Sequence, residues 1–118
     1  MSSSTSKNIF STTRTHIASL SIKEIATQFS TPTFVYDADV ILRRVAELSE
    51  FDVVRYAQKA NSNLAILALM KQQGVVLDAV SAGEIHRALR VGYQGGSDTS
   101  RGPEIVYTAD IFDQDALA

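Results

Sequence analysis

Short segments rich in β-branched and aromatic residues alternate with helical patterns through the second half of the sequence. The predicted strands are 53–57, 75–80 and 104–109, and each is followed by the start of a helical pattern. Parallel neighbours can be joined only by a crossover connection, usually a helix, so this alternation predicts a parallel sheet in an α/β fold. Parallel strands need cover on both faces, and the last strand is left at an open edge. We therefore expect the first part of a larger structure.

Two architectures contain such a sheet. A doubly wound open sheet carries a Gly-x-Gly-x-x-Gly turn after its first strand, and the sequence has no such turn. A closed (β/α)8 barrel needs roughly 250 residues. The 118 residues would supply about three of its βα units, and the third would have its helix beginning near Asp113.

Capping residues mark the ends of the predicted helices. Asn63 precedes a helix that Gly74 ends as a C′ glycine. Ser81 and Glu84 have the spacing of a capping box, in which the serine hydroxyl and the glutamate carboxylate each accept from an unpaired backbone amide. This second helix ends at Gly92.

A lead-in helix and strand precede these units. Residues 21–24 form another capping box before a short helix, which a proline-containing turn ends. Thr33–Tyr36 is a predicted strand because of its β-branched and aromatic content. Asp37 or Asp39 caps a further helix through about Leu48.

The first residues differ in composition from the rest. Ten of the residues in Met1–Leu20 are Ser or Thr, and no acidic residue occurs before Glu24. Such a stretch buries too little apolar surface to order itself, so we interpret residues 1–20 as a flexible lead-in and residues 21–118 as one partial domain. Its Ser-rich, acid-poor character leaves an organelle transit peptide open as an alternative.

Charge and composition exclude several functional classes. Eleven Lys and Arg residues against thirteen Asp and Glu residues give a net charge of −2, which is too balanced for a nucleic-acid binder. No polybasic block or run of about 18 apolar residues points to a membrane. The chain has no cysteine and only two distant histidines, so we expect no metal site. A reducing, cytoplasmic compartment fits this composition.

Lys59 is the residue that most strongly suggests chemistry. The chain has four lysines, and Lys59 alone directly follows a predicted buried strand, at the end where β/α barrels carry their active sites. An amine partly shielded from water there suits a lysine that must be neutral to form a Schiff base. The residues alone leave an exposed loop lysine as the alternative.

Two segments together resemble a known enzyme family. The first has the residues Tyr56, Ala57, Lys59, Ala60, Asn61 and Asn63. The second has Asp78, Ala79, Val80, Ser81, Ala82, Gly83 and Glu84. Together they resemble the cofactor-lysine segment and second-strand motif of the diaminopimelate decarboxylases, which are fold-type III, alanine racemase-like pyridoxal-phosphate enzymes. The resemblance runs from about residue 21 to the end of the chain.

The resemblance implies a fold and a site. The fold is the N-terminal part of a pyridoxal 5′-phosphate (PLP)-binding (β/α)8 TIM barrel. Lys59 matches the lysine that links covalently to PLP. Ala57 lies on the strand that would line the cofactor pocket, where a small residue can lie against the ring. Asp78 and Glu84 match acidic positions near the cofactor and its lysine. Each acid also has a structural explanation: Asp78 can be a polar group paired with a base such as Lys59, and Glu84 a capping-box acid.

The implied reaction is the decarboxylation of meso-2,6-diaminopimelate to L-lysine and CO2, by a homodimer acting on a small amino-acid substrate. A related ornithine, arginine or carboxynorspermidine decarboxylase, and a non-catalytic PLP-binding protein, are the alternatives. Ala82 replaces the first glycine of the family's usual second-strand motif. The family's phosphate-binding turn, ring-stacking histidine and partner-subunit elements belong to later sequence, so we expect these 118 residues alone to be inactive.

Overall fold

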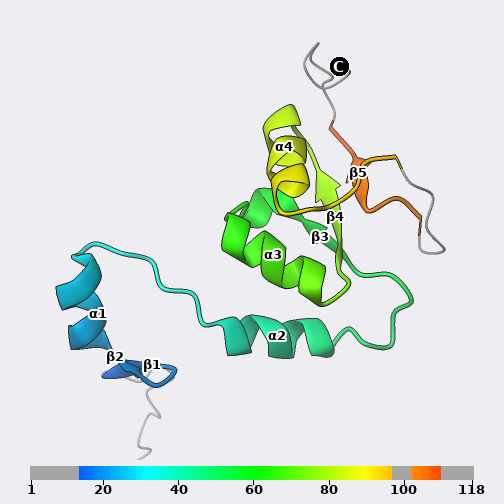
Figure 1. The fold of residues 1–118 in the computed structure, drawn as a ribbon. Helices are drawn as coiled ribbons and strands as arrows, with labels where there is room; N and C mark the ends of the chain where they lie inside the picture. The colour runs from blue at the N-terminus through cyan, green and yellow to red at the C-terminus, as the bar shows by residue number, and fades with distance from the viewer. Residues whose placement is uncertain (1–13, 97–101, 110–118) are drawn as a thin grey trace, which may run out of the picture. The chain divides into compact units, whose positions relative to one another are not determined.

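The computed structural model describes residues 14–96 and 102–109 (Figure 1). It divides into two compact units, Met1–Asp39 and Val40–Ala118, and each is described by itself. The predicted helix near Asp113 lies outside the described residues. No helix in the described ranges is long and apolar enough to cross a membrane.

The first unit contains a small hairpin and a helix. Strands β1 (His16–Ile17) and β2 (Leu20–Ser21) pair in antiparallel fashion, so part of the predicted flexible lead-in forms a hairpin. Helix α1 (Ile22–Phe29) begins where the sequence predicts, with Ser21 as its N-cap residue. The capping box is wrong, however, because the Ser21 side chain makes no cap hydrogen bond. The first backbone amide of the helix, that of Ile22, instead donates to the carbonyl of Thr15, the residue before the hairpin, at 2.9 Å.

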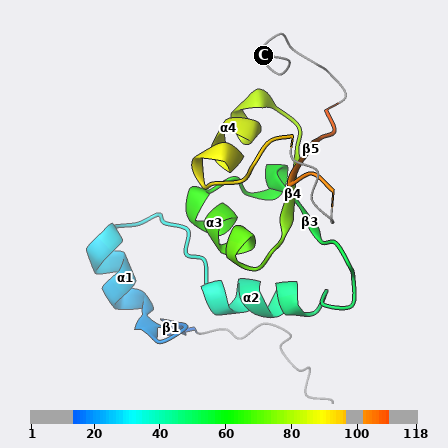
Figure 2. The ribbon, with the colours of Figure 1, turned by 45° about the vertical axis from the view of Figure 1, so that its right-hand side comes forward.

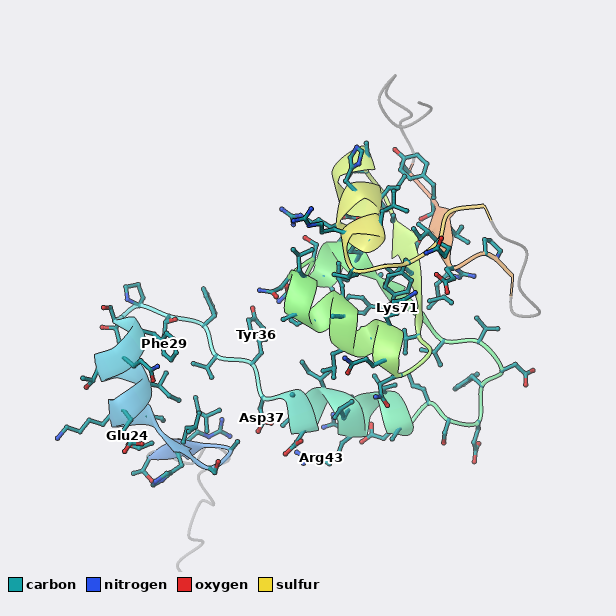
Figure 3. All side chains as sticks on the ribbon, viewed as in Figure 1. Glu24, Phe29, Tyr36, Asp37, Arg43 and Lys71 are labelled. Atoms are coloured by element: carbon teal, nitrogen blue, oxygen red, sulfur yellow. The ribbon has the colours of Figure 1, made fainter. Side chains whose placement is uncertain are left out.

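The predicted strand Thr33–Tyr36 is wrong. These residues follow α1 without regular structure, and Phe34 is 91% exposed. Tyr36 is also exposed, as its labelled side chain in Figure 3 illustrates. β-branched and aromatic residues favour a strand only when a neighbouring backbone completes the ladder. Within the described parts of the chain, no segment pairs with these residues.

Helix α2 (Ala38–Ala46) is held by a cap and by an apolar stripe. The Asp37 carboxylate accepts from the Asp39 amide at 3.0 Å, which settles which of the two aspartates caps the helix. Ile41 and Val45 pack against a buried cluster formed by Ile66 and Met70 of helix α3 (Leu64–Gln72) and by Val75. The helix ends before Leu48, which is 40% exposed.

The second unit is built on a three-stranded parallel sheet. Strands β3 (Arg55–Ala57), β4 (Val76–Ala79) and β5 (Ile105–Tyr107) pair in that order. The parallel α/β arrangement predicted from the alternating pattern is confirmed. Each strand is shorter than its predicted segment because only the residues that are hydrogen-bonded to a neighbouring strand belong to the ladder.

Helices cover one face of this sheet. Helix α3 (Leu64–Gln72) follows β3 and helix α4 (Ala82–Arg90) follows β4. Leu67 of α3, Leu77 of β4 and Ala88 of α4 form a fully buried core. Figures 1 and 2 both show these helices on the same side of the sheet, with no described helix across the other side. Side chains alternate along a strand, so the residues beside Leu77 point to the uncovered face.

The predicted caps of these helices are present. The Asn63 carboxamide oxygen accepts from the Ala65 amide at 2.9 Å. Gly74 and Gly92 have φ values of 71° and 92°, which glycine adopts without steric cost. These local signals fixed the positions of both helices, since caps act through neighbouring residues.

A polar cluster connects the start of β5 to helix α3. Lys71 (Figure 3) lies 3.3 Å from the Glu104 carboxylate and 4.7 Å from the ring centroid of Tyr93. The Gln94 amide donates to Glu104 at 2.6 Å. This amide, together with Lys71, lowers the pKa of Glu104 below its ordinary value. Burial, with the nearby Glu104 charge, raises the pKa of Tyr93 to about 12.

The Glu104 cluster predicts a dependence of stability on pH. The folded-state pKa of Glu104 lies below its ordinary value of 4.5, so its stabilisation is complete above that value and is lost as pH falls through the lower folded-state pKa. Denaturant unfolding from about pH 7 to about pH 3 should show Glu104→Gln with a lower midpoint at neutral pH and a weaker response to acid. Glu47→Gln, which alters the exposed pair with Arg44, is the control and should change little. Equal acid responses in wild type and Glu104→Gln would contradict this assignment.

Candidate functional site

The carboxyl ends of the three parallel strands bring the predicted site residues to one edge of the sheet. Lys59 lies in a single 3₁₀ turn, η1 (Gln58–Ala60), directly after β3. Asp78 lies in β4 and is the register partner of Ala57 on one side and of Val106 on the other. Register partners in a sheet point to the same face. Ala57 and Asp78 therefore share the face that the helices leave uncovered.

Asp78 has a different partner from the one predicted. The hydroxyl of Thr108 donates to its carboxylate at 2.6 Å, and Asp78 is half-buried. The predicted pairing with Lys59 is wrong, since neither ion pair among the described residues includes either group. Thr108 was missed by sequence reasoning. Its position two residues beyond Val106, on the same face as Asp78, becomes visible only once the strand register is known.

Lys59 is exposed, in contrast to the partial shielding predicted for it. The uncovered sheet face leaves its amine open to solvent, and the buried residue of the turn is the preceding Gln58. An exposed primary amine at this edge is accessible to a small molecule.

The loop that follows Lys59 is braced at three points. The Tyr56 hydroxyl donates to the Asn61 carbonyl at 2.9 Å. The Asn61 side chain accepts from the Asn63 amide at 3.0 Å, and Arg87 of α4 donates to the Ser62 hydroxyl. Asn61 thus stabilises the loop, and Asn63 caps α3 as predicted. The turn that carries Lys59 is consequently held in place from both β3 and α4.

Glu84 connects the start of α4 to the end of β4. Its amide donates to the Ser81 hydroxyl at 3.3 Å, as a capping box requires. Its carboxylate accepts from the amide of Val80 at 2.8 Å, one residue before the position that a capping box uses. Its carbonyl accepts from the Gln58 side chain at 2.8 Å. The half-buried Glu84 therefore links the end of β4, the start of α4 and the turn that contains Gln58.

These residues fit an aldehyde cofactor that binds a lysine. An accessible amine stands at the sheet edge, the small Ala57 leaves room on the uncovered face, and the carboxylate of Asp78 is oriented there by Thr108. Polar groups converging at the carboxyl ends of parallel strands are typical of active sites in β/α folds.

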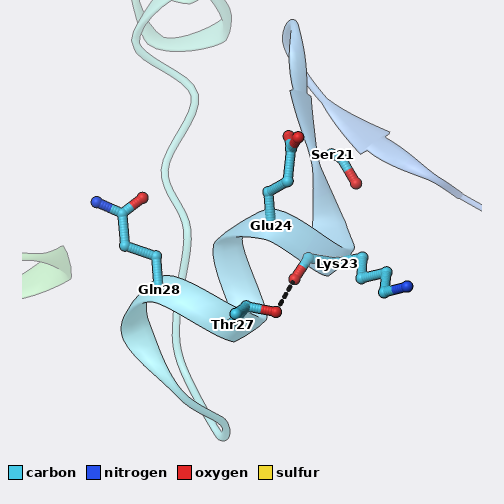
Figure 4. Close-up of a pocket in the computed structure, with 5 residues that line it drawn as sticks. All are labelled: Ser21, Lys23, Glu24, Thr27 and Gln28. Atoms are coloured by element: carbon cyan, nitrogen blue, oxygen red, sulfur yellow. Dashed lines mark hydrogen bonds between the residues drawn. The ribbon is translucent and has the colours of Figure 1, made fainter.

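A pocket in the first unit is separate from these groups. Five side chains of the β2–α1 segment line it (Figure 4): Ser21, Lys23, Glu24, Thr27 and Gln28. The Thr27 hydroxyl donates to the Lys23 carbonyl at 2.9 Å, which is an ordinary contact within a helix. None of the predicted site residues lines this pocket.

Comparison with known proteins identifies the class. Residues 38–118 match the family model described as pyridoxal-dependent decarboxylase, pyridoxal binding domain. The chain belongs to this family. The predicted cofactor class and the partial barrel fold are confirmed by this match, and the barrel is not closed by the described strands.

Individual relatives carry a more particular name. Diaminopimelate decarboxylase of Escherichia coli strain K12 is 46% identical over 110 residues, which are 93% of this chain and 25% of that protein. The Streptomyces coelicolor enzyme of the same name is 50% identical over 92 residues, which are 78% of this chain and 20% of that protein. A crystal structure of diaminopimelate decarboxylase superposes with a TM-score of 0.72 at 50% identity, covering 80% of this chain and 22% of that one. The chain thus spans about a quarter of the length of these curated relatives.

The contact between Asp78 and Thr108 predicts an energetic coupling. In a double-mutant cycle with Asp78→Ala and Thr108→Val, measured by denaturant unfolding, we expect a coupling free energy of about 1–2 kcal/mol, because each substitution removes one partner of a hydrogen bond to a charged group. Thr108→Ser retains the hydroxyl and serves as the matched control. Additive effects of the two substitutions would contradict the contact.

Proposed function

We propose that this chain is the lysine-bearing part of the PLP-binding barrel of a diaminopimelate decarboxylase. The observation that carries the proposal is Lys59, an accessible amine on a braced turn at the carboxyl edge of a parallel sheet. The identity of 45–50% to enzymes named diaminopimelate decarboxylase supports meso-2,6-diaminopimelate as the substrate and L-lysine and CO2 as the products of the whole protein.

Each residue of the site has a proposed role. Lys59 holds the cofactor through its Nζ atom, and Ala57 leaves room beside it. Asp78 faces the same space, with Thr108 holding its carboxylate. Glu84 lies near the cofactor in this proposal, and its carboxylate holds the connection between β4 and α4 by accepting from the Val80 amide. PLP, when bound, supplies an electron sink for the charge left as CO2 departs.

The proposal extends to the setting in which the whole protein acts. We propose a homodimer with a small amino-acid substrate and no nucleic-acid partner, in the cytoplasm. The balanced net charge of −2 supports the absence of a nucleic-acid partner. Residues 21–118 would form the barrel part, and residues 1–20 the lead-in.

Reductive trapping tests the cofactor lysine directly. After incubation with PLP and borohydride, peptide mapping of the wild-type chain should show phosphopyridoxyl label mainly on Lys59 rather than on Lys23 or Lys71. Lys71 is engaged by Glu104 and Tyr93, which lowers its availability. Lys59→Ala should lose this label, whereas Lys23→Ala, an exposed control, should keep it. Label distributed equally over the lysines would contradict the assignment.

A chimera tests the reaction. This chain replaces the matching quarter of the E. coli diaminopimelate decarboxylase, and CO2 release is measured with diaminopimelate, ornithine, arginine and carboxynorspermidine. We expect activity with diaminopimelate, and a loss on the order of a thousandfold in Lys59→Ala, because the covalent step loses its amine. Preference for another substrate would favour a related decarboxylase. A folded, PLP-binding chimera with no activity would favour a non-catalytic role.

A further inference from the structure

Gln58 is a fully buried polar side chain, with 0% of its surface exposed. Its Nε2 donates to the carbonyl oxygen of Glu84 at 2.8 Å. Its Oε1 is buried as well, and has no hydrogen-bond partner. Gln58 directly precedes Lys59 in the turn η1.

The unpaired oxygen makes glutamine a poor choice for stability at this position. Burying an acceptor without a partner costs its hydration, whereas an apolar side chain of the same length would bring no such cost. Methionine has that length and fills irregular space well. Packing alone therefore does not explain the amide, and a residue that breaks a local stability rule points to a functional constraint.

The amide group ties the lysine turn to α4. The Glu84 carbonyl that receives it lies in the first turn of α4, and the Glu84 carboxylate binds the amide of Val80. One side chain thus connects the end of β3 to the end of β4 through Glu84. Gln58 is buried while the adjacent Lys59 is exposed, so the two side chains leave the turn in different directions.

We propose that Gln58 is a positioning residue for Lys59, acting through its hydrogen bond to Glu84. This inference rests on the proposed function, because it gives Lys59 a defined orientation toward the cofactor. This role explains why a glutamine precedes the lysine, which neither helix capping nor core packing explains.

The test separates orientation of the lysine from stability. The 118-residue chain and its Gln58→Met variant are labelled with PLP and borohydride, and the ratio of label on Lys59 to label on Lys23 is measured by peptide mapping. We expect the ratio to fall about fivefold in Gln58→Met, because the loss of one ordinary hydrogen bond changes the population of the correctly oriented lysine by about that factor. The thermal midpoint should stay equal or rise, because removing the unpaired buried oxygen offsets the loss of the hydrogen bond to Glu84.

Tyr93→Phe is the matched control. It also removes one buried side-chain hydrogen bond to a backbone carbonyl, that of Val75 at 2.8 Å, but leaves the lysine turn intact. It should lower the thermal midpoint and keep the labelling ratio. An unchanged ratio in Gln58→Met, or a fall in Tyr93→Phe of the same size, would overturn the inference. So would a midpoint loss in Gln58→Met as large as that in Tyr93→Phe. Equal labelling of the lysines in the wild-type chain would instead overturn the proposed function and, with it, this inference.

Discussion

Parallel hydrogen bonding between β3, β4 and β5 is the constraint on which the site depends. The register that pairs Ala57 with Asp78 and Asp78 with Val106 brings the three carboxyl ends to one edge. The same alternation directs Leu77 to the helices and Asp78 to the uncovered face. One set of backbone contacts thereby separates a buried apolar side from a side that carries polar groups.

The turn after β3 shows how a short motif can serve both chemistry and structure. Around Lys59, the side chains of Tyr56, Gln58 and Asn61 each bond to nearby backbone or to α4. A long, flexible lysine gains little from its own few contacts, so its position depends on the backbone that carries it. The segment that identifies the family is therefore also the one that holds the amine in place.

Local signals were sufficient to locate the helices and to predict that the strands are parallel. Asn63, Gly74 and Gly92 mark helix ends through contacts with their own neighbours, and the structure retains each of them. Signals that depend on distant partners were less reliable. Thr33–Tyr36 has the composition of a strand but no ladder partner in the described residues. The Ser21 capping box is a local signal that failed, although helix α1 still begins where that signal predicts.

The sequence by itself determined the α/β class, the family and the candidacy of Lys59, because periodicity, caps and motif spacing are all written in consecutive residues. Only the tertiary structure decided the partners of the site residues. Thr108 reaches Asp78 from 30 positions away, and Gln58 reaches Glu84 from 26. Such contacts follow from the register of parallel strands and from the docking of α4, and neither is encoded in the spacing of any single segment.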